Sequence, residues 1–202
     1  MSNRIALAAI LAGGKARRMG RDKVTLDVGG IPMVEHVFNA VSGVAESVVL
    51  VGGGPALADR GVPTIADRYP GTNAIGGVAT ALAYATETVG RDTPVLCVAC
   101  DMPLLEPALL DLLRRLQIGW DAAVPRTASG YEPLCAVYRA GALPAFEAEI
   151  ARGNLRVYDA YPALRVREVS EEELRRADPT LRSFLNVNRP EDLSEVRARL
   201  RA

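Results

Sequence analysis

This chain of 202 residues has no excess of either charge, because Lys plus Arg number 24 and Asp plus Glu also number 24. A protein held by bulk charge on nucleic acid or on an acidic membrane carries a basic excess, so we expect no nucleic-acid and no membrane partner. No apolar run reaches the roughly 20 residues that a membrane-spanning helix needs. No small-residue cleavage site follows the apolar first residues, so we expect no secretory signal and a cytoplasmic protein.

Cysteine and histidine are also scarce, with three cysteines and one histidine. Cys97 and Cys100 form a C-x-x-C, but they fall in an apolar run that is typical of a buried strand. A zinc site would need two more paired ligands, and only Cys135 and His36 remain. We therefore interpret the cysteines as reduced core residues. No Ser-His-Asp or Cys-His arrangement is found, and His36 lies among apolar residues of a predicted helix.

Hydrophobic residues make up 49 % of the chain, which is enough to bury a sizeable core. Strand-like runs alternate with helical patterns, which predicts a single-domain α/β fold, Rossmann-like, with a mostly parallel central sheet covered by helices on both faces. The predicted strands cover residues 5–11, 47–51, 62–66, 94–100, 122–125, 133–138, 164–169 and 183–187. The predicted helices cover residues 32–41, 76–88, 107–116, 142–152 and 190–200.

Ligands of such sheets bind beyond the carboxyl ends of the strands. The loop after the first predicted strand reads L-A-G-G-K-A-R-R-M-G-R-D-K over residues 11–23. Gly13 and Gly14 permit a tight turn, and consecutive backbone N–H groups there form an anion nest. Five basic residues against one acidic residue favour a polyphosphate ligand. Neither the P-loop nor the dinucleotide fingerprint is present, and a solvated basic loop is the alternative interpretation.

Further along the chain, oxygen ligands follow other predicted strands. Asp101 comes directly after an apolar strand, where a carboxylate near a phosphate loop suits magnesium, although it could also be a turn or N-cap residue. Asn186 and Asn188 share one face of a predicted strand end, and amide oxygens can complete a magnesium shell. Asn188 is alternatively the N-cap of the last helix. Asp67 either binds a ribose hydroxyl or stabilises its turn.

Together these patterns resemble molybdenum cofactor guanylyltransferase, the family that joins GMP to molybdopterin. The motifs are L-A-G-G-K-A-R-R-M-G-x-D-K after the first strand, C-D-x-P-L around Asp101 and N-V-N-x-P-E-D-L near the end, and the resemblance runs from Ile5 to Leu193. It implies one nucleotidyltransferase domain over residues 1–202, with a nucleotide-binding part of roughly residues 1–105 and a pterin-side part of roughly residues 106–202. It also implies GTP and molybdenum-molybdopterin as substrates, magnesium as the cofactor, molybdoenzymes as recipients of the product, and a monomer.

The resemblance assigns a role to each candidate residue. The backbone of residues 11–14 would pack against guanine and ribose, basic residues would hold the phosphates, and a carboxylate would bind magnesium. The nucleotide-binding set is Leu11, Ala12, Gly13, Gly14, Lys23, Asp67 and Asp101. The catalytic set is Lys15, Arg18, Lys23 and Asp101. Asn186, Asn188 and Arg156 belong to the pterin side, and Asp101 and Asn188 are the metal ligands.

Two loops near the expected base pocket depart from the family pattern. Residues 73–77 read N-A-I-G-G where the family has G-P-L-x-G, and Gly52-Gly53-Gly54 replaces a polar residue. Glu132 before Pro133 is also unexpected. The alternatives are a cytidylyltransferase acting on the same cofactor, a sugar-1-phosphate nucleotidyltransferase, and a non-catalytic cofactor carrier. L-A-G-G instead of L-A-A-G, and an asparagine pair instead of an acidic pair, favour GTP.

Overall fold

The computed structural model describes residues 4–13 and 23–200. A central sheet has the strand order β10-β7-β9-β6-β1-β4-β5, and β8 pairs with β7. The strands are β1 (Ile5–Leu11), β2 (Asp27–Val28), β3 (Ile31–Pro32), β4 (Ala45–Val51), β5 (Thr64–Ile65), β6 (Pro94–Ala99), β7 (Ala122–Thr127), β8 (Gly130–Tyr131), β9 (Cys135–Arg139) and β10 (Val166–Ser170).

Six α-helices and several 3₁₀ turns connect the described strands. The α-helices are α1 (Met33–Ser42), α2 (Asn73–Thr88), α3 (Pro107–Leu116), α4 (Leu143–Arg152), α5 (Glu171–Arg175) and α6 (Pro190–Leu200). The 3₁₀ helices are η2 (Lys23–Thr25), η3 (Ala58–Arg60), η4 (Ala140–Ala142), η5 (Val157–Ala163) and η6 (Arg182–Phe184). No helix in the described part of the chain is long and apolar enough to cross a membrane.

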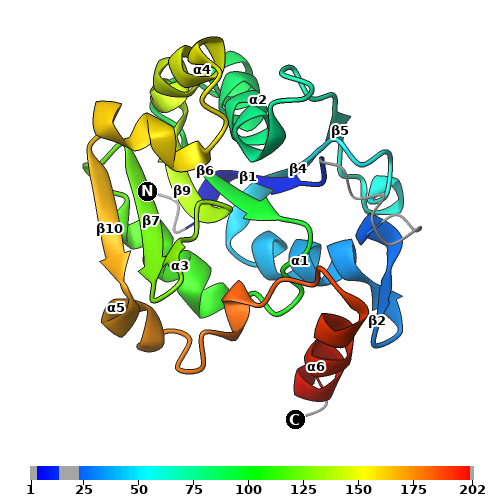
Figure 1. The fold of residues 1–202 in the computed structure, drawn as a ribbon. Coiled ribbons are helices and arrows are strands. Elements are labelled where there is room, and N and C mark those ends of the chain that lie inside the picture. Colours follow the sequence, from blue (N-terminus) through cyan, green and yellow to red (C-terminus); the bar gives the residue numbers. More distant parts are fainter. Residues whose placement is uncertain (1–3, 14–22, 201–202) are drawn as a thin grey trace.

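Strand β1 lies at the middle of the sheet, between the parallel strands β4 and β6. Its sequence IALAAIL is apolar throughout because both of its faces are covered by helices. Figure 1 shows α2 and α4 on one side of the sheet and α1 and α3 on the other. Ala8 and Ile10 pack on the α1–α3 side, and Leu7 and Ala9 pack on the α2 side. This alternation is the two-residue period of a strand, and it divides the core into two layers.

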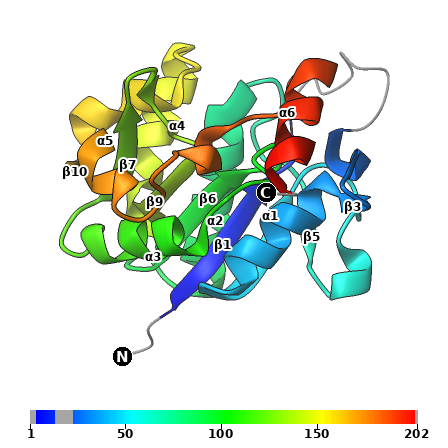
Figure 2. The same cartoon turned by 90° about the horizontal axis from the view of Figure 1, so that it is seen from below.

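A smaller apolar cluster holds the end of the chain in place. Val196 of α6 and Val187 pack against Val28 of the β2–β3 hairpin, and Figure 2 shows α6 beside this hairpin and α1. An Arg197 Nη2 donates to the carbonyl of Asp27 at 3.0 Å. His36 Nε2 donates to the carbonyl of Val28 at 2.6 Å, so the histidine supports the hairpin.

The predicted α/β fold, with helices on both faces of a mostly parallel sheet, is confirmed. The antiparallel strands of this sheet are β9, between β6 and β7, and β8, which pairs with the end of β7. The predicted strand over residues 183–187 is wrong: η6 covers Arg182–Phe184, and the chain continues without regular structure. Ser183 N donates to Asp178 Oδ2 at 2.8 Å, and Ser183 Oγ accepts from Glu106 N at 3.0 Å. These hydrogen bonds, one local and one to the chain before α3, take the place of a strand ladder.

All three cysteines are free and buried, as expected for core residues. Burial raises the pKa of the Cys97 thiol well above its usual range, and it does the same for Cys135. Both thiols are therefore protonated and chemically inert at neutral pH.

Candidate functional site

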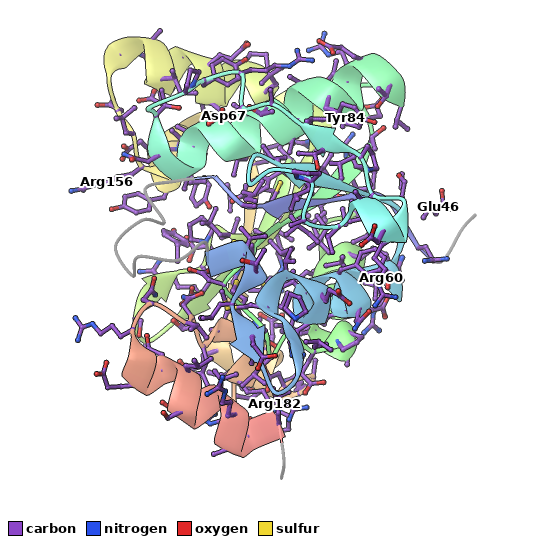
Figure 3. The ribbon with its side chains drawn as sticks, turned by 90° about the vertical axis from the view of Figure 1, so that its right-hand side faces the viewer. Glu46, Arg60, Asp67, Tyr84, Arg156 and Arg182 are labelled. Carbon is purple, nitrogen blue, oxygen red and sulfur yellow. The ribbon has the colours of Figure 1, made fainter. Side chains whose placement is uncertain are left out.

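The carboxyl ends of the parallel strands meet at one edge of the sheet. Strands β1, β4, β5 and β6 run in the same direction. Strand β9 is antiparallel to both β6 and β7, so β7 also ends at this edge. Figure 3 shows Glu46, at the start of β4, on the opposite side of the molecule from Arg156. In α/β sheets the carboxyl edge is where ligands bind.

Backbone hydrogen bonds bring the loops after three strands into contact at this edge. Ala12 N donates to the carbonyl of Val51 at 2.9 Å, and Cys100 N donates to the carbonyl of Leu11 at 3.1 Å. Leu11 and Ala12 are buried, whereas Gly13 is exposed. The glycine loop therefore begins in contact with the loops that follow β4 and β6.

Gly52 and Gly53 are required by the close approach of the loop after β4 to the loop after β1. Both have a backbone φ of +72°, which residues other than glycine rarely adopt. A Cβ at Gly53 would lie 2.5 Å from the Ala12 Cβ, and one at Gly52 would lie 3.3 Å from the Gly13 Cα. The Gly52-Gly53 pair thus lets one backbone lie directly against the other beside the glycine loop.

The first turn of α2 also reaches the end of β1. A Cβ at Gly77 would lie 3.7 Å from the side chain of Leu11, and one at Gly76 would lie 2.1 Å from Thr72 Oγ1. The 16 residues of α2 present their N-terminus, which carries a partial positive charge, at the carboxyl edge. Helix α2 begins at Asn73, three residues earlier than predicted.

Asp67 stabilises the chain between β5 and α2. Its Oδ1 accepts from Tyr69 N at 2.9 Å and from Thr80 Oγ1 at 3.2 Å. Thr80 Oγ1 in turn accepts from Arg68 N at 3.0 Å. The turn role considered for Asp67 is therefore present, and its contact with a nucleotide stays a prediction.

Asp101 is half-buried and lies beside the two asparagines. Val187 N donates to the carbonyl of Asp101 at 2.9 Å. Val187 is buried, whereas Asn186 and Asn188 on either side of it are exposed. The two asparagines are therefore both exposed next to the backbone of Asp101, and the segment that carries them is not the strand that was predicted. Asp192 Oδ2 accepts from the backbone N–H of Asn188 at 2.8 Å and stabilises the start of α6.

A second set of contacts fixes this segment to the loop after β6. Arg182 forms an ion pair with Glu106, and Glu106 N donates to the buried Ser183 Oγ. The chain therefore enters the Asn186–Asn188 stretch from a fixed position next to α3.

Comparison with known proteins shows which family has this arrangement. A family model described as a MobA-like NTP transferase domain matches residues 8–166. The chain belongs to this family. It is therefore a nucleotidyltransferase, and both the resemblance and the enzyme class stated from its motifs are confirmed.

Members of the MobA-like NTP transferase family are similar to this chain over nearly its whole length. A "Probable molybdenum cofactor guanylyltransferase" of Pelotomaculum thermopropionicum is 37 % identical, covering 95 % of this chain and 92 % of its own. The "Molybdenum cofactor guanylyltransferase" of Desulfosudis oleivorans is 32 % identical, covering 96 % and 95 %. The crystal structure of molybdopterin-guanine dinucleotide biosynthesis protein A from Archaeoglobus fulgidus matches with a TM-score of 0.82 at 28 % identity, covering 96 % and 98 %.

One departure from the family's G-P-L-x-G motif has a structural explanation. Asn73 takes the place of the first glycine and has φ of +59°. Asparagine is among the residues that best tolerate this left-handed conformation, so it suits a position where the motif has glycine. Gly77 retains the last glycine of the motif.

The structure describes only some of the residues predicted for the family site. Gly14, Lys15 and Arg18 lie outside the described residues, and Lys23 is described only as the backbone start of η2. Arg156 is exposed at the start of η5, where its N–H donates to Asp159 Oδ2 at 3.2 Å. Within the described ranges, no group of three or more His, Cys, Asp or Glu residues is placed to hold a metal.

Sequence reasoning gave no role to Glu132 or to the tyrosines near Arg156. Glu132 is half-buried, its Oε1 accepts from Thr127 Oγ1 at 3.2 Å, and burial raises the pKa of its carboxyl group. The ring of Tyr131 contacts those of Tyr158 and Tyr161. One signal was available: four of the six tyrosines fall between residues 131 and 161.

Proposed function

We propose that the chain transfers GMP from GTP to the terminal phosphate of molybdenum-molybdopterin, which yields molybdopterin guanine dinucleotide and pyrophosphate. The observation that carries the proposal is the joining of three motif segments at one sheet edge. Cys100 N bonds to the Leu11 carbonyl, and Val187 N bonds to the Asp101 carbonyl. The names of relatives that match over most of the chain support the two substrates.

The nucleotide side of the proposed site is built from backbone and basic side chains. Residues 11–14 would lie against guanine and ribose, and Lys15, Arg18 and Lys23 would neutralise the triphosphate. The close approach of Gly53 to Ala12 and of Gly52 to Gly13 supports this role, because it brings backbone without side chains directly beside the glycine loop. The N-terminus of α2 favours an anion at the same edge.

Magnesium is proposed as the cofactor, and the side chains present suit it. Asp101 offers a hard carboxylate at the carboxyl end of β6, and the exposed asparagines beside it offer amide oxygens. A single carboxylate is enough, because magnesium in such enzymes is completed by substrate phosphates and water. When bound, the ion would neutralise charge on the phosphates during transfer.

The proposed reaction places few demands on acid–base groups. The attacking terminal phosphate of the acceptor is already ionised at neutral pH, so it needs no general base to attack the α-phosphorus of GTP. This agrees with a chain that has one histidine, which here supports the β2–β3 hairpin. The chain's contribution is positioning and charge neutralisation around the leaving pyrophosphate.

We further propose that both halves of the chain act together as one domain, a cytoplasmic monomer whose product passes to molybdoenzymes. The nucleotide part, roughly residues 1–105, contributes β6, and the pterin-side part, roughly residues 106–202, contributes β9. Because β6 and β9 pair from Pro94↔Arg139 to Val98↔Cys135, the sheet continues across the division. This continuity supports one functional unit.

A nucleotide panel tests the proposal. The purified protein is incubated with Mg²⁺, molybdenum-loaded molybdopterin and one of GTP, CTP, ATP or UTP, and pyrophosphate and dinucleotide are measured. We expect turnover with GTP and little with the other three. A preference for CTP would show that the chain is a cytidylyltransferase on the same cofactor. Nucleotide binding without any turnover would favour a cofactor carrier.

A further inference from the structure

A cluster of aromatic rings lies at the carboxyl end of β7. The ring of Tyr131 meets that of Tyr161 edge-on, with centroids 5.3 Å apart, and it lies 6.4 Å from that of Tyr158 at an angle of 33°. Arg156 places its guanidinium carbon 5.8 Å from the centre of the Tyr158 ring. Such a distance permits a cation–π interaction.

Hydrogen bonds hold the inner rings of this cluster. Tyr138 OH donates to the carbonyl of Pro133 at 2.8 Å, so the Tyr161 OH, 2.9 Å away, donates to Tyr138. Tyr131 OH donates to Glu168, and this bond together with burial raises the pKa of the Tyr131 phenol. Hydrogen bonds therefore hold Tyr131, which contacts Tyr158, and Tyr161, which contacts Tyr131.

The outer ring of the cluster is open to solvent on the ligand-binding edge. Tyr158 is 41 % exposed. Tyr131, which it contacts, pairs with Arg126 near the carboxyl end of β7, and Figure 3 shows the neighbouring Arg156 on that side of the molecule. The exposed Trp120, by contrast, precedes β7 and lies at the opposite edge. An exposed ring backed by fixed rings and flanked by a guanidinium is suited to a flat heteroaromatic ligand.

The cluster lies on the half of the edge away from the guanine loops. Only β9 lies between β7 and β6, the strand that leads to Asp101. At ~4.8 Å per strand spacing, β7 and β6 are about 10 Å apart. The loops that contain Gly52 and Asn73 lie beyond β1, on the other side of Asp101. A ligand on Tyr158 would therefore approach Asp101 from the side opposite the nucleotide base.

We propose that Tyr158 and Arg156, backed by Tyr131, form a stacking surface for the pterin ring system of the acceptor. This inference rests on the proposed function and adds Tyr158 and Tyr131 to the acceptor side, where the family resemblance already placed Arg156. The planar ring of the acceptor would stack on the exposed ring of Tyr158, within reach of the Arg156 guanidinium that lies over that ring. The acceptor phosphate would then extend along the sheet edge toward Asp101.

Two readouts test this surface. The first is the KM for molybdenum-molybdopterin and for GTP, measured separately. The second is titration of the protein with free 6-hydroxymethylpterin, followed by pterin fluorescence, which needs no turnover. Tyr158→Ala should raise the acceptor KM about tenfold and weaken pterin binding similarly, with the GTP KM unchanged. Tyr158→Phe should restore both values, because the phenyl ring still stacks.

Control variants keep the test decisive. Trp120→Ala removes a ring of similar exposure, 39 %, at the opposite edge and should change neither readout. If Tyr158→Ala does not fold, Tyr158→Leu keeps apolar volume without an aromatic face and should behave as predicted for the alanine variant. Normal acceptor KM and pterin binding in a folded Tyr158 variant would overturn the stacking surface while guanylyl transfer stands. A raised KM for GTP in a Tyr158 variant would also overturn the stacking surface, because it would place the Tyr158 ring in the nucleotide site. If the wild type transfers no GMP, the proposed function fails, and the pterin titration alone decides the surface.

Discussion

Replacing Gly53 by alanine tests how closely the loops after β1 and β4 must approach. The new Cβ would lie 2.5 Å from the Ala12 Cβ and 3.3 Å from the Ala12 carbonyl oxygen. The φ of +72° adds a backbone penalty of roughly 1–2 kcal/mol for any residue with a Cβ. Overpacking adds about 1–3 kcal/mol, so we expect a loss of about 2–5 kcal/mol of unfolding free energy.

Gly54→Ala is the matched control for this substitution. Gly54 has a similar φ of +67°, but a Cβ there would meet nothing within 4 Å. Only the backbone penalty of roughly 1–2 kcal/mol applies, and the effect of alanine on the unfolded chain is the same at both positions. The difference between the two variants therefore isolates the contact with Ala12.

Urea unfolding and thermal melting measure these losses. A loss of about 2–5 kcal/mol lowers the Tm of a chain of this size by about 4–20 °C. The dissociation constant for GTP should rise in Gly53→Ala and change little in Gly54→Ala, because only the former displaces Ala12 from the proposed nucleotide site. Equal effects of the two substitutions on Tm and on GTP binding would refute the reasoning from close approach.

Three further predictions concern the rest of the site. Asp101→Ala should lower turnover ~10²-fold or more with an unchanged Tm, because it removes the proposed magnesium ligand; near-normal turnover would contradict this role. Burial raises the pKa of the Glu132 carboxyl group above its value in the unfolded chain. Stability is therefore lost as the pH rises from the unfolded pKa through the folded one, because the buried carboxyl group then ionises. Glu132→Gln should therefore raise the Tm at pH 8 and leave it unchanged at pH 4, and a gain at pH 4 would argue against this origin. Ser183→Ala leaves Glu106 N without its acceptor and should cost about 1–3 kcal/mol by urea unfolding; a loss under 0.5 kcal/mol would mean that the bond contributes little.

Elements with a clear apolar period could be predicted from the sequence. Strand β1 was predicted with its observed bounds, and α3 also matches over residues 107–116. The predicted strand over residues 183–187 failed because its apolar residues pack in an irregular segment. Hydrogen bonds of Asp178 and Glu106, neither visible in a hydrophobic pattern, decide that conformation.

The candidate site was predictable where a motif is local and not where distant segments meet. The glycine loop, Asp101 and the asparagines stand out as short patterns, and the structure brings the described ones to one edge. The packing of Gly53 on Ala12 depends on the pairing of β1 with β4, which no local pattern reveals. The ring contact of Tyr131 with Tyr158 likewise joins β8 to η5 across 27 residues of sequence.

The most direct test of guanylyl transfer follows the phosphorus atoms of GTP. The protein is supplied with Mg²⁺, molybdenum-molybdopterin and GTP labelled with ³²P at either the α or the γ position. The account predicts that α-label enters the dinucleotide product, that γ-label appears only in pyrophosphate, and that Asp101→Ala loses both signals together. Release of γ-label as inorganic phosphate, or a product that contains no α-label, would contradict it.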